Sequence, residues 1–378
     1  MIDFEIVREQ ERITEYRDDW NQLFDSGDYE ASTSYEWCKV LLETHLIKND
    51  EMVLVLIKDD GKIIGIIPVI LSIKRKYGQS IRYLFPVSEY YNTHSDILIK
   101  QLSDEPIKVF FNAIFSLRSK WDVIIIQRLI EWNPLVESIR NYCNYNSIKY
   151  FVRKEQPSYF ITLPGHLEEY LRKRSRNFRR SLIKNQRKLY SLGEIRIEKV
   201  VKPEEMEQAF DKILRIEESS WKGSHGTSIK SVWKQYDFYR RLCRAVSQKG
   251  WIHLQFLLMN NDPVAYNMGL IIKKRYFYLK TSFDERYREY SPSMILRVNL
   301  IEELIKRNIN EIDFTAEPYE WQKRWSEEYR WHKSLTIYNN TIKARLHNFY
   351  NFVNARLEDR KGNGIKFANP MDLRPYGE

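Results

Sequence analysis

The sequence predicts an α/β protein, of the α+β kind, with two similar modules that are each a mixed, mostly antiparallel sheet flanked by helices. First, its 378 residues fit two domains of about 150 to 190 residues each. Second, the stretch 251–283 alternates apolar and polar residues and breaks at two turns, which predicts three antiparallel strands. Third, helices, a hairpin, another strand, then a helix and a strand occur before residue 150 and again after residue 200.

Patterning and turn residues predict the elements of the first module. The strand FEIV opens the chain, and amphipathic helices follow over 12–24 and from about Ser34. Asp59-Asp60-Gly61-Lys62 joins two β-rich runs, which predicts a hairpin over 51–75. The remaining elements are the strand 80–85, the polar and aromatic loop 86–98, the helix 106–118, the buried strand 121–129 and a helix before Lys149.

The second module is expected after a linker between Glu155 and Leu167, within which FITL is a candidate strand of the first sheet. Its elements are helices over 206–221 and 233–246, the three strands of 251–283, an amphipathic helix over 294–305 and the buried strand EIDFTA. The predicted domains are therefore 1–160, 161–345, and a C-terminal helix and tail at 346–378.

The junction Tyr290-Ser291-Pro292-Ser293 is where ligand binding is expected. Ser291 can cap the helix, and Pro292 fits its first position because the helix needs no donor there. The N–H groups of the first turn lack partners in the helix, and such a helix start favours an anion such as a pyrophosphate. Ser-Pro-Ser is also an ordinary helix opening, so the junction alone does not identify a ligand.

Composition narrows the class of protein. Hydrophobic residues make up 43% of the chain and aromatic residues 14%, enough for packed cores. The net charge of +10 favours anionic partners. Cys38, Cys143 and Cys243 are far apart in sequence, so neither a metal site nor a disulfide framework is expected. With no signal-like N-terminus and a longest apolar run of nine residues, 63–71, a cytoplasmic protein is expected, or one at the inner face of the membrane.

Four stretches resemble the CelD-like acetyltransferases, a branch of the GNAT superfamily close to the Fem-type peptidyltransferases of cell-wall synthesis. They are TSFDERYREYSPSMIL (281–296), NEIDFTAEPYEWQKRW (310–325), ESSWKG (218–223) and the basic stretch YLRKRSRNFRRSLIKNQRKL (170–189). The resemblance implies two tandem GNAT-like modules, the first on the acceptor side and the second carrying the acyltransferase site. Two positions depart from the family, because Ser293 and Thr315-Ala316 stand where glycine is usual and leave the backbone less free to approach a phosphate.

The resemblance implies that an acyl group moves from acetyl-CoA, or another acyl-CoA, to an amine. In the GNAT fold the fourth strand polarises the donor carbonyl, and the resemblance places that strand at Tyr276–Ser282. The residues expected to bind the donor are Lys280, Thr281, Ser291, Ser293 and Met294.

Acyl transfer to an amine requires a base for the amine proton and an acid for the leaving group. Tyr290 and Tyr278 are candidates for the acid. Asp313 is the candidate base, because a carboxylate in an apolar strand must be paired or have a raised pKa. An ion pair with an arginine such as Arg297 or Arg324 is the alternative. The other carboxylates near the motifs are Glu217, Glu218 and Asp284.

Lys323 resembles the lysine with which Fem-type enzymes steady developing negative charge. It could equally be a cation stacked on Trp321 or Trp325. Both readings keep Lys323 among aromatic side chains.

Two groups are expected to bind the acceptor. By resemblance Trp221 and Lys222 line the acceptor cleft, although they also fit the end of a helix that stops at Gly223. In the first module the loop residues that suit a sugar or peptide are Tyr90, Tyr91, Asn92 and Asp96.

The stretch from Arg172 to Lys188 has nine lysines and arginines and no acid. Its expected apolar face consists of Leu171, Phe178, Leu182, Ile183 and Leu189. The cations fit a solvated helix face, or they hold the phosphates of coenzyme A, a tRNA acceptor stem, an anionic polymer or a lipid surface.

Three functions fit these observations. The first is a GNAT-type N-acyltransferase that acts on an amine such as an amino sugar in surface-polysaccharide or cell-envelope synthesis. The second is a Fem-type aminoacyl transferase that uses charged tRNA on a peptidoglycan precursor. The third is a non-catalytic binding module that keeps the fold. The first is preferred, with no stable nucleic-acid partner.

Overall fold

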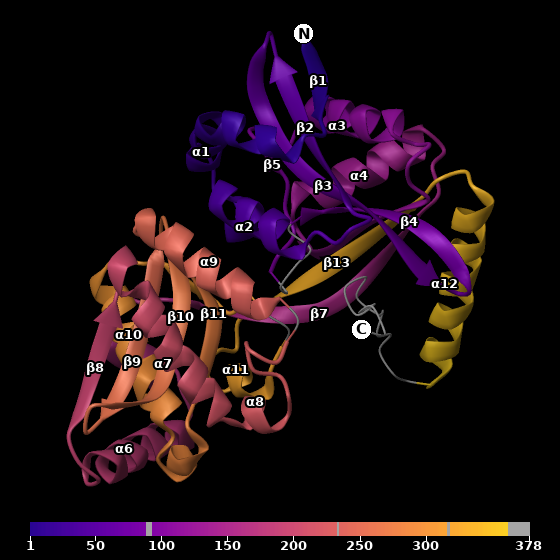
Figure 1. The fold of residues 1–378 in the computed structure, drawn as a ribbon. Coiled ribbons are helices and arrows are strands. Elements are labelled where there is room, and N and C mark those ends of the chain that lie inside the picture. Colours follow the sequence, from indigo (N-terminus) through magenta and orange to yellow (C-terminus); the bar gives the residue numbers. More distant parts are fainter. Residues whose placement is uncertain (88–92, 233, 316–317, 362–378) are drawn as a thin grey trace. The chain divides into compact units, whose positions relative to one another are not determined.

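The computed structural model describes residues 1–87, 93–232, 234–315 and 318–361, with side chains not described at 352 and 354–361. The chain forms two compact units (Figure 1): unit 1 contains Met1–Glu155 and Trp331–Glu378, and unit 2 contains Gln156–Arg330. The chain enters unit 2 within strand β7 (Tyr150–Thr162) and leaves it within β13 (Tyr329–Tyr338). The sequence places residues 331–345 in the second module, but they belong to unit 1. The reason is that β13 pairs with β6, a strand of unit 1.

Unit 1 has a sheet in the order β1-β2-β3-β4-β6-β13, with β5 beside β3. Its other strands are β1 (Ile2–Val7), β2 (Glu51–Asp59), β3 (Lys62–Lys76), β4 (Gln79–Pro86), β5 (Leu98–Ile99) and β6 (Val123–Ile130). Its helices are α1 (Arg17–Asp25), α2 (Tyr35–His45), α3 (Asp104–Ser116), α4 (Pro134–Tyr145) and α12 (Ile342–Lys361). The pairs β1–β2, β2–β3, β3–β4, β3–β5 and β6–β13 are antiparallel, whereas β4 and β6 are parallel, so the mixed sheet with flanking helices confirms the predicted fold class.

Local chemistry explains most of unit 1. Asp60 and Gly61 both have positive φ, 46° and 79°, as a two-residue hairpin turn requires, so the hairpin is confirmed. The hydroxyl of Ser34 accepts a hydrogen bond from the amide of Trp37 and caps α2. The helix predicted over 12–24 is wrong in one respect, because a 3-10 helix, η1 (Gln10–Tyr16), precedes α1. The Thr14 hydroxyl donates to Glu11 O at 3.0 Å and favours this tighter turn.

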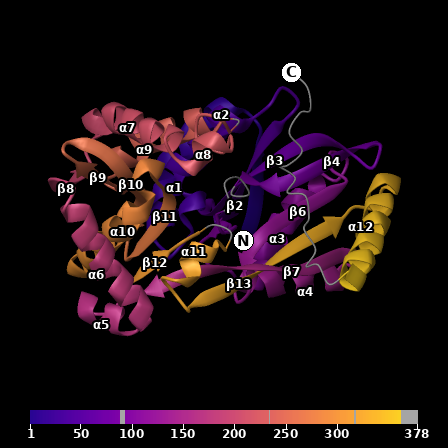
Figure 2. The ribbon, with the colours of Figure 1, turned by 90° about the horizontal axis from the view of Figure 1, so that it is seen from below.

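Unit 2 has a sheet in the order β7-β12-β11-β10-β9-β8, in which β11 and β12 are parallel. Its other strands are β8 (Ile195–Val200), β9 (Ile252–Met259), β10 (Asp262–Ile272), β11 (Arg275–Phe283) and β12 (Glu311–Asp313). Its helices are α5 (Leu167–Arg172), α6 (Arg176–Tyr190), α7 (Met206–Glu218), α8 (Trp221–Ser224), α9 (Gln235–Gln248), α10 (Pro292–Lys306) and α11 (Glu320–Lys323), and the 3-10 helix η5 (Glu285–Tyr290) precedes α10. As Figure 2 shows, α7 and α9 cover one face of the strands β9 to β11, and α6 and α10 cover the other.

Three predictions for this unit are corrected. The segment FITL forms part of β7 and pairs with β12 in the sheet of unit 2, so it does not complete the first sheet. Residues 219 and 220 separate α7 from α8, so Trp221 and Lys222 begin a short helix instead of ending a long one. At Gly223 a Cβ would lie 2.3 Å from Glu218 O, which explains why glycine is needed for this close approach. The strand EIDFTA shortens to Glu311–Asp313, because Thr315, with φ 51°, turns the chain away.

Candidate active site

A β-bulge in β11 divides the candidate site between the two faces of the sheet. Met268 lies opposite Lys280 and Gly269 opposite Tyr278, so Leu279 has no partner in the β10–β11 ladder. Side chains two residues apart in a regular strand lie on the same face. Because of the bulge, Tyr278 packs on the α10 side whereas Lys280 contacts α9 on the opposite side.

Gly269 permits this bulge. A Cβ there would lie 2.3 Å from the ring of Tyr276 and 2.5 Å from Phe277 O, so no larger residue fits without moving β11. A glycine inside an apolar strand often marks a bulge or a close backbone approach. Gly269 was therefore the sequence signal that could have located the bulge.

The parallel strands β11 and β12 part next to the bulge. They pair at three positions, the last of which is Phe277 with Asp313, whereas β11 continues to Phe283. Thr315 then donates its hydroxyl to Tyr278 O at 3.1 Å. Among the residues that the structure describes, no strand pairs with this edge of β11 beyond Phe277, so the backbone there has no partner in a strand ladder.

Helix α10 begins beyond the end of β11. Pro292 occupies the first helical position, as predicted, and the first turn contains no acidic residue. The predicted cap is wrong: Ser291 has φ 50° and ψ 55°, and its Oγ accepts from Asn185 Nδ2 at 3.1 Å instead of capping the helix. The amide of Met294 donates to Ser291 O. Ser293 Oγ is buried without a hydrogen-bond partner among the described residues, and its amide is one of the first N–H groups of the helix.

Lys280 lies on the α9 face, away from the start of α10 where donor binding is expected. Its Nζ donates to Gln235 Oε1 at 2.9 Å and lies 5.0 Å from the centre of the Tyr239 ring. Burial and the nearby charge of Lys222 lower the pKa of Lys280 to about 8. A lysine with this pKa is partly neutral under mildly alkaline conditions and can accept a proton.

Glu217 anchors the α7 side of the site. Its carboxylate is fully buried and accepts hydrogen bonds from Lys222 Nζ (2.8 Å), the Tyr266 hydroxyl (2.6 Å) and the Ile229 amide (2.6 Å). Burial alone would raise its pKa, but the charges of Lys222 and Lys280 hold the pKa of Glu217 below its ordinary value. Glu217 therefore stays ionised and acts as a fixed counter-charge instead of a proton acceptor.

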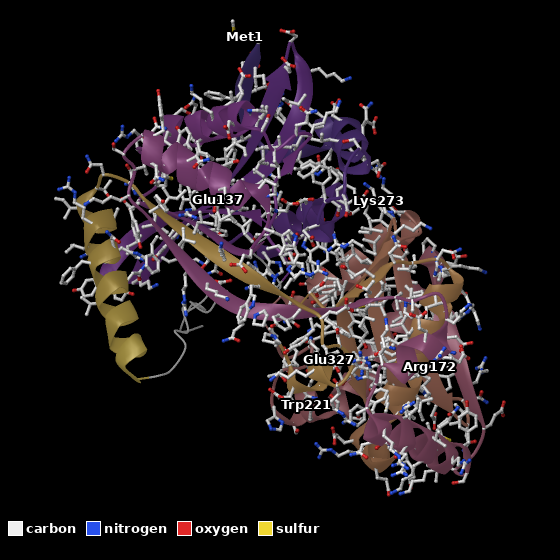
Figure 3. All side chains as sticks on the ribbon, turned by 180° about the vertical axis from the view of Figure 1, so that it is seen from behind. Met1, Glu137, Arg172, Trp221, Lys273 and Glu327 are labelled. Atoms are coloured by element: carbon white, nitrogen blue, oxygen red, sulfur yellow. The ribbon has the colours of Figure 1, made fainter. Side chains whose placement is uncertain are left out.

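The predicted acceptor residues Trp221 and Lys222 have different surroundings. Lys222 Nζ also donates to Thr281 O at 2.8 Å, so it connects α8 to β11. Trp221, labelled in Figure 3, is 44% exposed and remains accessible to a ligand. Thr281, predicted to bind the donor, gives its hydroxyl to Tyr266 O at 3.0 Å.

On the α10 face, Tyr278 belongs to a cluster with a buried arginine. The Tyr278 hydroxyl donates to Asn267 Oδ1 and accepts from Arg297 Nε at 3.3 Å. The Arg297 guanidinium lies 4.2 Å from the centre of the Trp321 ring and 4.8 Å from that of Trp325. Arg297, which the sequence offered only as a partner for Asp313, is thus the cation stacked on these tryptophans.

Lys323 and Tyr290 lie apart from this cluster. Lys323 pairs with Glu320 at 2.6 Å, and its side chain is 49% exposed, so it is not the aromatic-enclosed lysine that the sequence suggested. Tyr290 hydrogen-bonds Glu289, which raises its pKa, and it packs against a different apolar cluster from that of Tyr278. The structure therefore does not bring the two candidate acids together.

Asp313 is fully buried and paired. Its Oδ2 lies 3.0 Å from Arg275 NH2 and 3.6 Å from Arg330 NH1, and its Oδ1 accepts from the Thr315 amide at 2.8 Å. The ion-pair alternative is therefore the observed one, with Arg275 and Arg330 in place of Arg297 or Arg324.

Of the predicted acceptor residues in unit 1, Tyr90, Tyr91 and Asn92 lie outside the described residues. Asp96 is described, and its Oδ1 accepts from the Ile97 amide at 2.9 Å and from Asn133 Nδ2 at 3.3 Å. Burial, with the nearby charge of Glu30, raises the pKa of Asp96 to about 7.

The basic stretch, which includes Arg172 in Figure 3, continues into α6 beside the start of α10. Lys188 pairs with Glu289 at 3.7 Å in η5. The apolar side of α6 buries Phe178, Leu182 and Leu189. Ile183, which the sequence assigned to this apolar face, is 51% exposed, so that assignment is wrong. Six cations make neither an ion pair nor a side-chain hydrogen bond among the described residues: Arg172, Arg176, Arg179, Arg180, Lys184 and Arg187. Arg174 makes no ion pair either, but its NH1 donates to Trp325 O at 3.1 Å.

Comparisons with known proteins agree with this geometry. Residues 176–323 match the family model of the acetyltransferase (GNAT) domain. The crystal structure of FemX is 10% identical with a TM-score of 0.58, over 89% of this chain and 98% of FemX. A conserved protein of unknown function from Bacteroides thetaiotaomicron is 9% identical with a TM-score of 0.55, over 89% of this chain and 100% of the other.

The C-terminal domain of a putative lysylphosphatidylglycerol synthetase from Agrobacterium fabrum is 10% identical with a TM-score of 0.53, over 88% of this chain and 94% of that domain. No curated protein matches the sequence. In the described part of the chain, every helix is too short or too polar to cross a bilayer. The protein thus has a GNAT-type acyltransferase fold, and its second unit contains the stretch that matches the GNAT acetyltransferase domain.

Proposed function

We propose that the protein is an N-acyltransferase of the CelD-like kind that moves an acetyl or other acyl group from acyl-CoA to an amine. The acceptor that we favour is an amino sugar used in surface-polysaccharide or cell-envelope synthesis. The observation that carries the proposal is the parting of β11 from β12 beside the acid-free start of α10. This combination offers, in one unit, a strand edge that no described strand pairs with and a helix start that favours an anion.

The donor contacts follow from that arrangement. In the first turn of α10 Pro292 has no N–H and the Met294 amide donates to Ser291 O, so the Ser293 amide would donate to the diphosphate of coenzyme A. The buried Ser293 hydroxyl, which has no hydrogen-bond partner among the described residues, would donate one more hydrogen bond. The departure from glycine at this position therefore adds a donor to the site. The bulge residue Leu279 would present its backbone to the thioester carbonyl.

The proposed chemical step uses one residue from each face of the sheet, Lys280 from the α9 face and Tyr278 from the α10 face. The acceptor nitrogen attacks the thioester carbonyl, the C–N bond forms, the C–S bond breaks, and the nitrogen loses a proton. Lys280, with a pKa of about 8, would take that proton in its neutral form. Tyr278, with Arg297 beside its hydroxyl, would return a proton to the thiolate. Asp313 and Lys323 would stabilise the fold through their ion pairs.

The comparisons support the acceptor class indirectly. The matched stretch 176–323 includes Lys222, Lys280 and Ser293. The resemblance to Fem-type enzymes of cell-wall synthesis and the shared fold with a domain of a lysylphosphatidylglycerol synthetase both favour an acceptor from the cell envelope. An enzyme that acts on an acceptor of this kind could bind at the inner face of the membrane.

A second candidate, a Fem-type aminoacyl transferase, is favoured by one observation. The six cations on and before α6 that have neither an ion pair nor a side-chain hydrogen bond among the described residues form an extended basic surface beside the start of α10. A polyanion such as charged tRNA would contact several of them, and its affinity would fall steeply with salt concentration.

Thermal unfolding with acetyl-CoA and with tRNA tests the proposal. Acetyl-CoA at about 100 times its dissociation constant should stabilise the protein by about 2.7 kcal/mol, whereas tRNA should not. Release of free thiol with glucosamine as acceptor should then follow. Stabilisation by tRNA but not by acetyl-CoA would support the second candidate. If neither ligand stabilises the protein, both transferase functions are contradicted and a non-catalytic role is favoured.

A further inference from the structure

A pocket of about 460 Å³ lies in unit 1, outside the site described above. It is lined by the turn after α3, by the end of α4 and the turn that follows it, by the end of β13 and by the start of α12. Its volume is within the range of small-molecule sites. Every lining residue belongs to unit 1, so the pocket does not depend on unit 2.

Buried polar contacts hold the wall that α12 provides. His347 is 2% exposed, and its Nε2 lies 3.0 Å from the Tyr83 hydroxyl in β4. The Thr341 hydroxyl donates to Asp122 Oδ1 at 2.9 Å, just before α12 begins. In Figure 1, α12 accordingly lies beside the end of β4. The wall is therefore fixed before a ligand arrives.

The floor of the pocket is fixed in the same way. Asn339 is 6% exposed, and its Nδ2 donates to Arg118 O at 2.6 Å and to Trp121 O at 2.7 Å. The Tyr338 amide donates to Lys149 O at 2.9 Å. These bonds involve the backbone of Arg118 and Lys149 and leave both cationic side chains available.

The described lining carries three cations, Arg118, Lys149 and Arg345, and no carboxylate. Arg118 and Lys149 make no ion pair within 4.0 Å among the described residues. Arg345 NH2 donates at 2.6 Å to Asn340 Oδ1, a neutral acceptor. Three like charges around one pocket without a counter-charge favour an anion, most strongly one with several oxygen acceptors.

The uncharged lining suits a sugar ring. Phe115 and Tyr142, whose ring centroids are 6.1 Å apart, offer apolar surface. The side-chain amides of Asn146 and Asn348 offer both donors and acceptors for hydroxyl groups. Aromatic surface, amides and unpaired cations together match a phosphorylated carbohydrate better than a bare inorganic ion or a neutral sugar.

We propose that this pocket binds a sugar phosphate. Isothermal titration calorimetry on the full chain, with glucose 1-phosphate, inorganic phosphate and glucose as probes, tests it. Glucose 1-phosphate should bind with a dissociation constant of roughly 0.01–1 mM, and the other two should bind at least about tenfold more weakly. Binding should weaken as salt is raised.

Arg118→Gln and Lys149→Gln should each weaken glucose 1-phosphate binding about tenfold, the expected loss for a charge-assisted hydrogen bond. Both substitutions keep the backbone bonds of the floor, and the matched control Lys100→Gln, on the surface of unit 1 outside the pocket, should change nothing. Two outcomes would overturn the proposal: no heat of binding in titrations up to about 5 mM glucose 1-phosphate, or equal glucose 1-phosphate affinity in all three Gln variants. Equal affinity for inorganic phosphate and glucose 1-phosphate would show that the pocket does not recognise the sugar ring. Acetyl-CoA binding should be unaffected in these variants, so this proposal can fail independently of the acyltransferase proposal.

Discussion

Helices α3 and α10 occupy corresponding places in the two units, yet their first turns differ in charge. The first turn of α3 contains Asp104 and Glu105. That of α10 contains no acid, and its Ser293 hydroxyl is buried with no hydrogen-bond partner in the part of the chain that the structure describes. Carboxylates at a helix start satisfy its partial positive charge from within the chain and repel a phosphate. The start of α10 leaves that charge for a ligand.

The strands before these helices differ as well. In both units the strand pairs in parallel with its neighbour at few positions, two for β4 with β6 and three for β11 with β12. The ladder between β3 and β4 has no shift of register, whereas that between β10 and β11 contains the bulge at Leu279. The two units thus share a topology, but among the described residues only unit 2 combines a bulged strand edge with an acid-free helix start. The shared topology therefore does not by itself provide the features of the proposed donor site.

The largest effect on activity is expected from substitution of Lys280, the lysine that follows the bulge in β11. Lys280→Met should lower kcat/KM by about 10² to 10⁴, because it removes the proposed proton acceptor. The wild-type rate should rise with pH through about 8, since Lys280 accepts a proton only when neutral. Steady-state rates of thiol release from pH 6 to 9 measure both. The matched control Lys274→Met alters an exposed lysine of the same hairpin and should leave the rate unchanged. A flat pH profile, or equal rates in the two variants, would remove Lys280 from the mechanism.

A somewhat smaller effect is expected from an acid at the start of α10. Ser293→Asp gives this helix the charge that α3 already has, and it should weaken acetyl-CoA binding about a hundredfold by repulsion of the diphosphate. The same charge should not lower the melting temperature, because an acid near a helix start stabilises the helix by about 0.3–1 kcal/mol. Titration calorimetry and thermal unfolding give the two values.

The matched control for Ser293→Asp is the double variant Asp104→Asn, Glu105→Gln in α3. It removes acids from the corresponding helix of unit 1 and should leave acetyl-CoA binding unchanged. A gain or loss of donor affinity in the control, or unchanged affinity in Ser293→Asp, would show that the difference between the two helix starts is not what selects unit 2.

The smallest effect is expected from Asp96→Asn in unit 1, which should change the stability of the protein and not its activity. The folded-state pKa of Asp96, about 7, is above its unfolded value of about 3.9. Between these values the folded protein holds a proton that the unfolded chain has lost, so Asp96 lowers stability as pH rises to about 7. Asp96→Asn should raise stability by about 1–2 kcal/mol at pH 8 and by little at pH 4. Melting temperatures from pH 4 to 8 test this, and parallel curves for variant and wild type would contradict it.

Sequence patterning predicted the elements well because their causes are local. The Asp60-Gly61 turn, the Ser34 cap and the first helical position of Pro292 all depend on residues within a few positions. Periodicity likewise located the three strands of β9, β10 and β11. Turns, caps and helix starts of this kind form in the folded protein as their local sequence predicts, unless tertiary contacts favour another conformation.

The arrangement of the site was less predictable because it depends on pairing between strands. The sequence placed Lys280 in a strand over 276–282 but did not reveal the bulge opposite Gly269, which turns this lysine to the α9 face. The sequence offered Arg297 as a partner for Asp313, but only tertiary packing stacks it on two tryptophans. The αL conformation of Ser291, which prevents capping, also has no signal in the sequence because serine rarely adopts it.

Amide hydrogen–deuterium exchange with and without acetyl-CoA tests the central claim most directly, since it reads both units in one experiment. Exchange should slow at residues 279–281 of β11 and 293–295 of α10, with no change at residues 83–86 of β4 and 104–107 of α3. Unchanged exchange at the start of α10 under saturating acetyl-CoA, or protection confined to unit 1, would contradict the assignment of the donor site to unit 2.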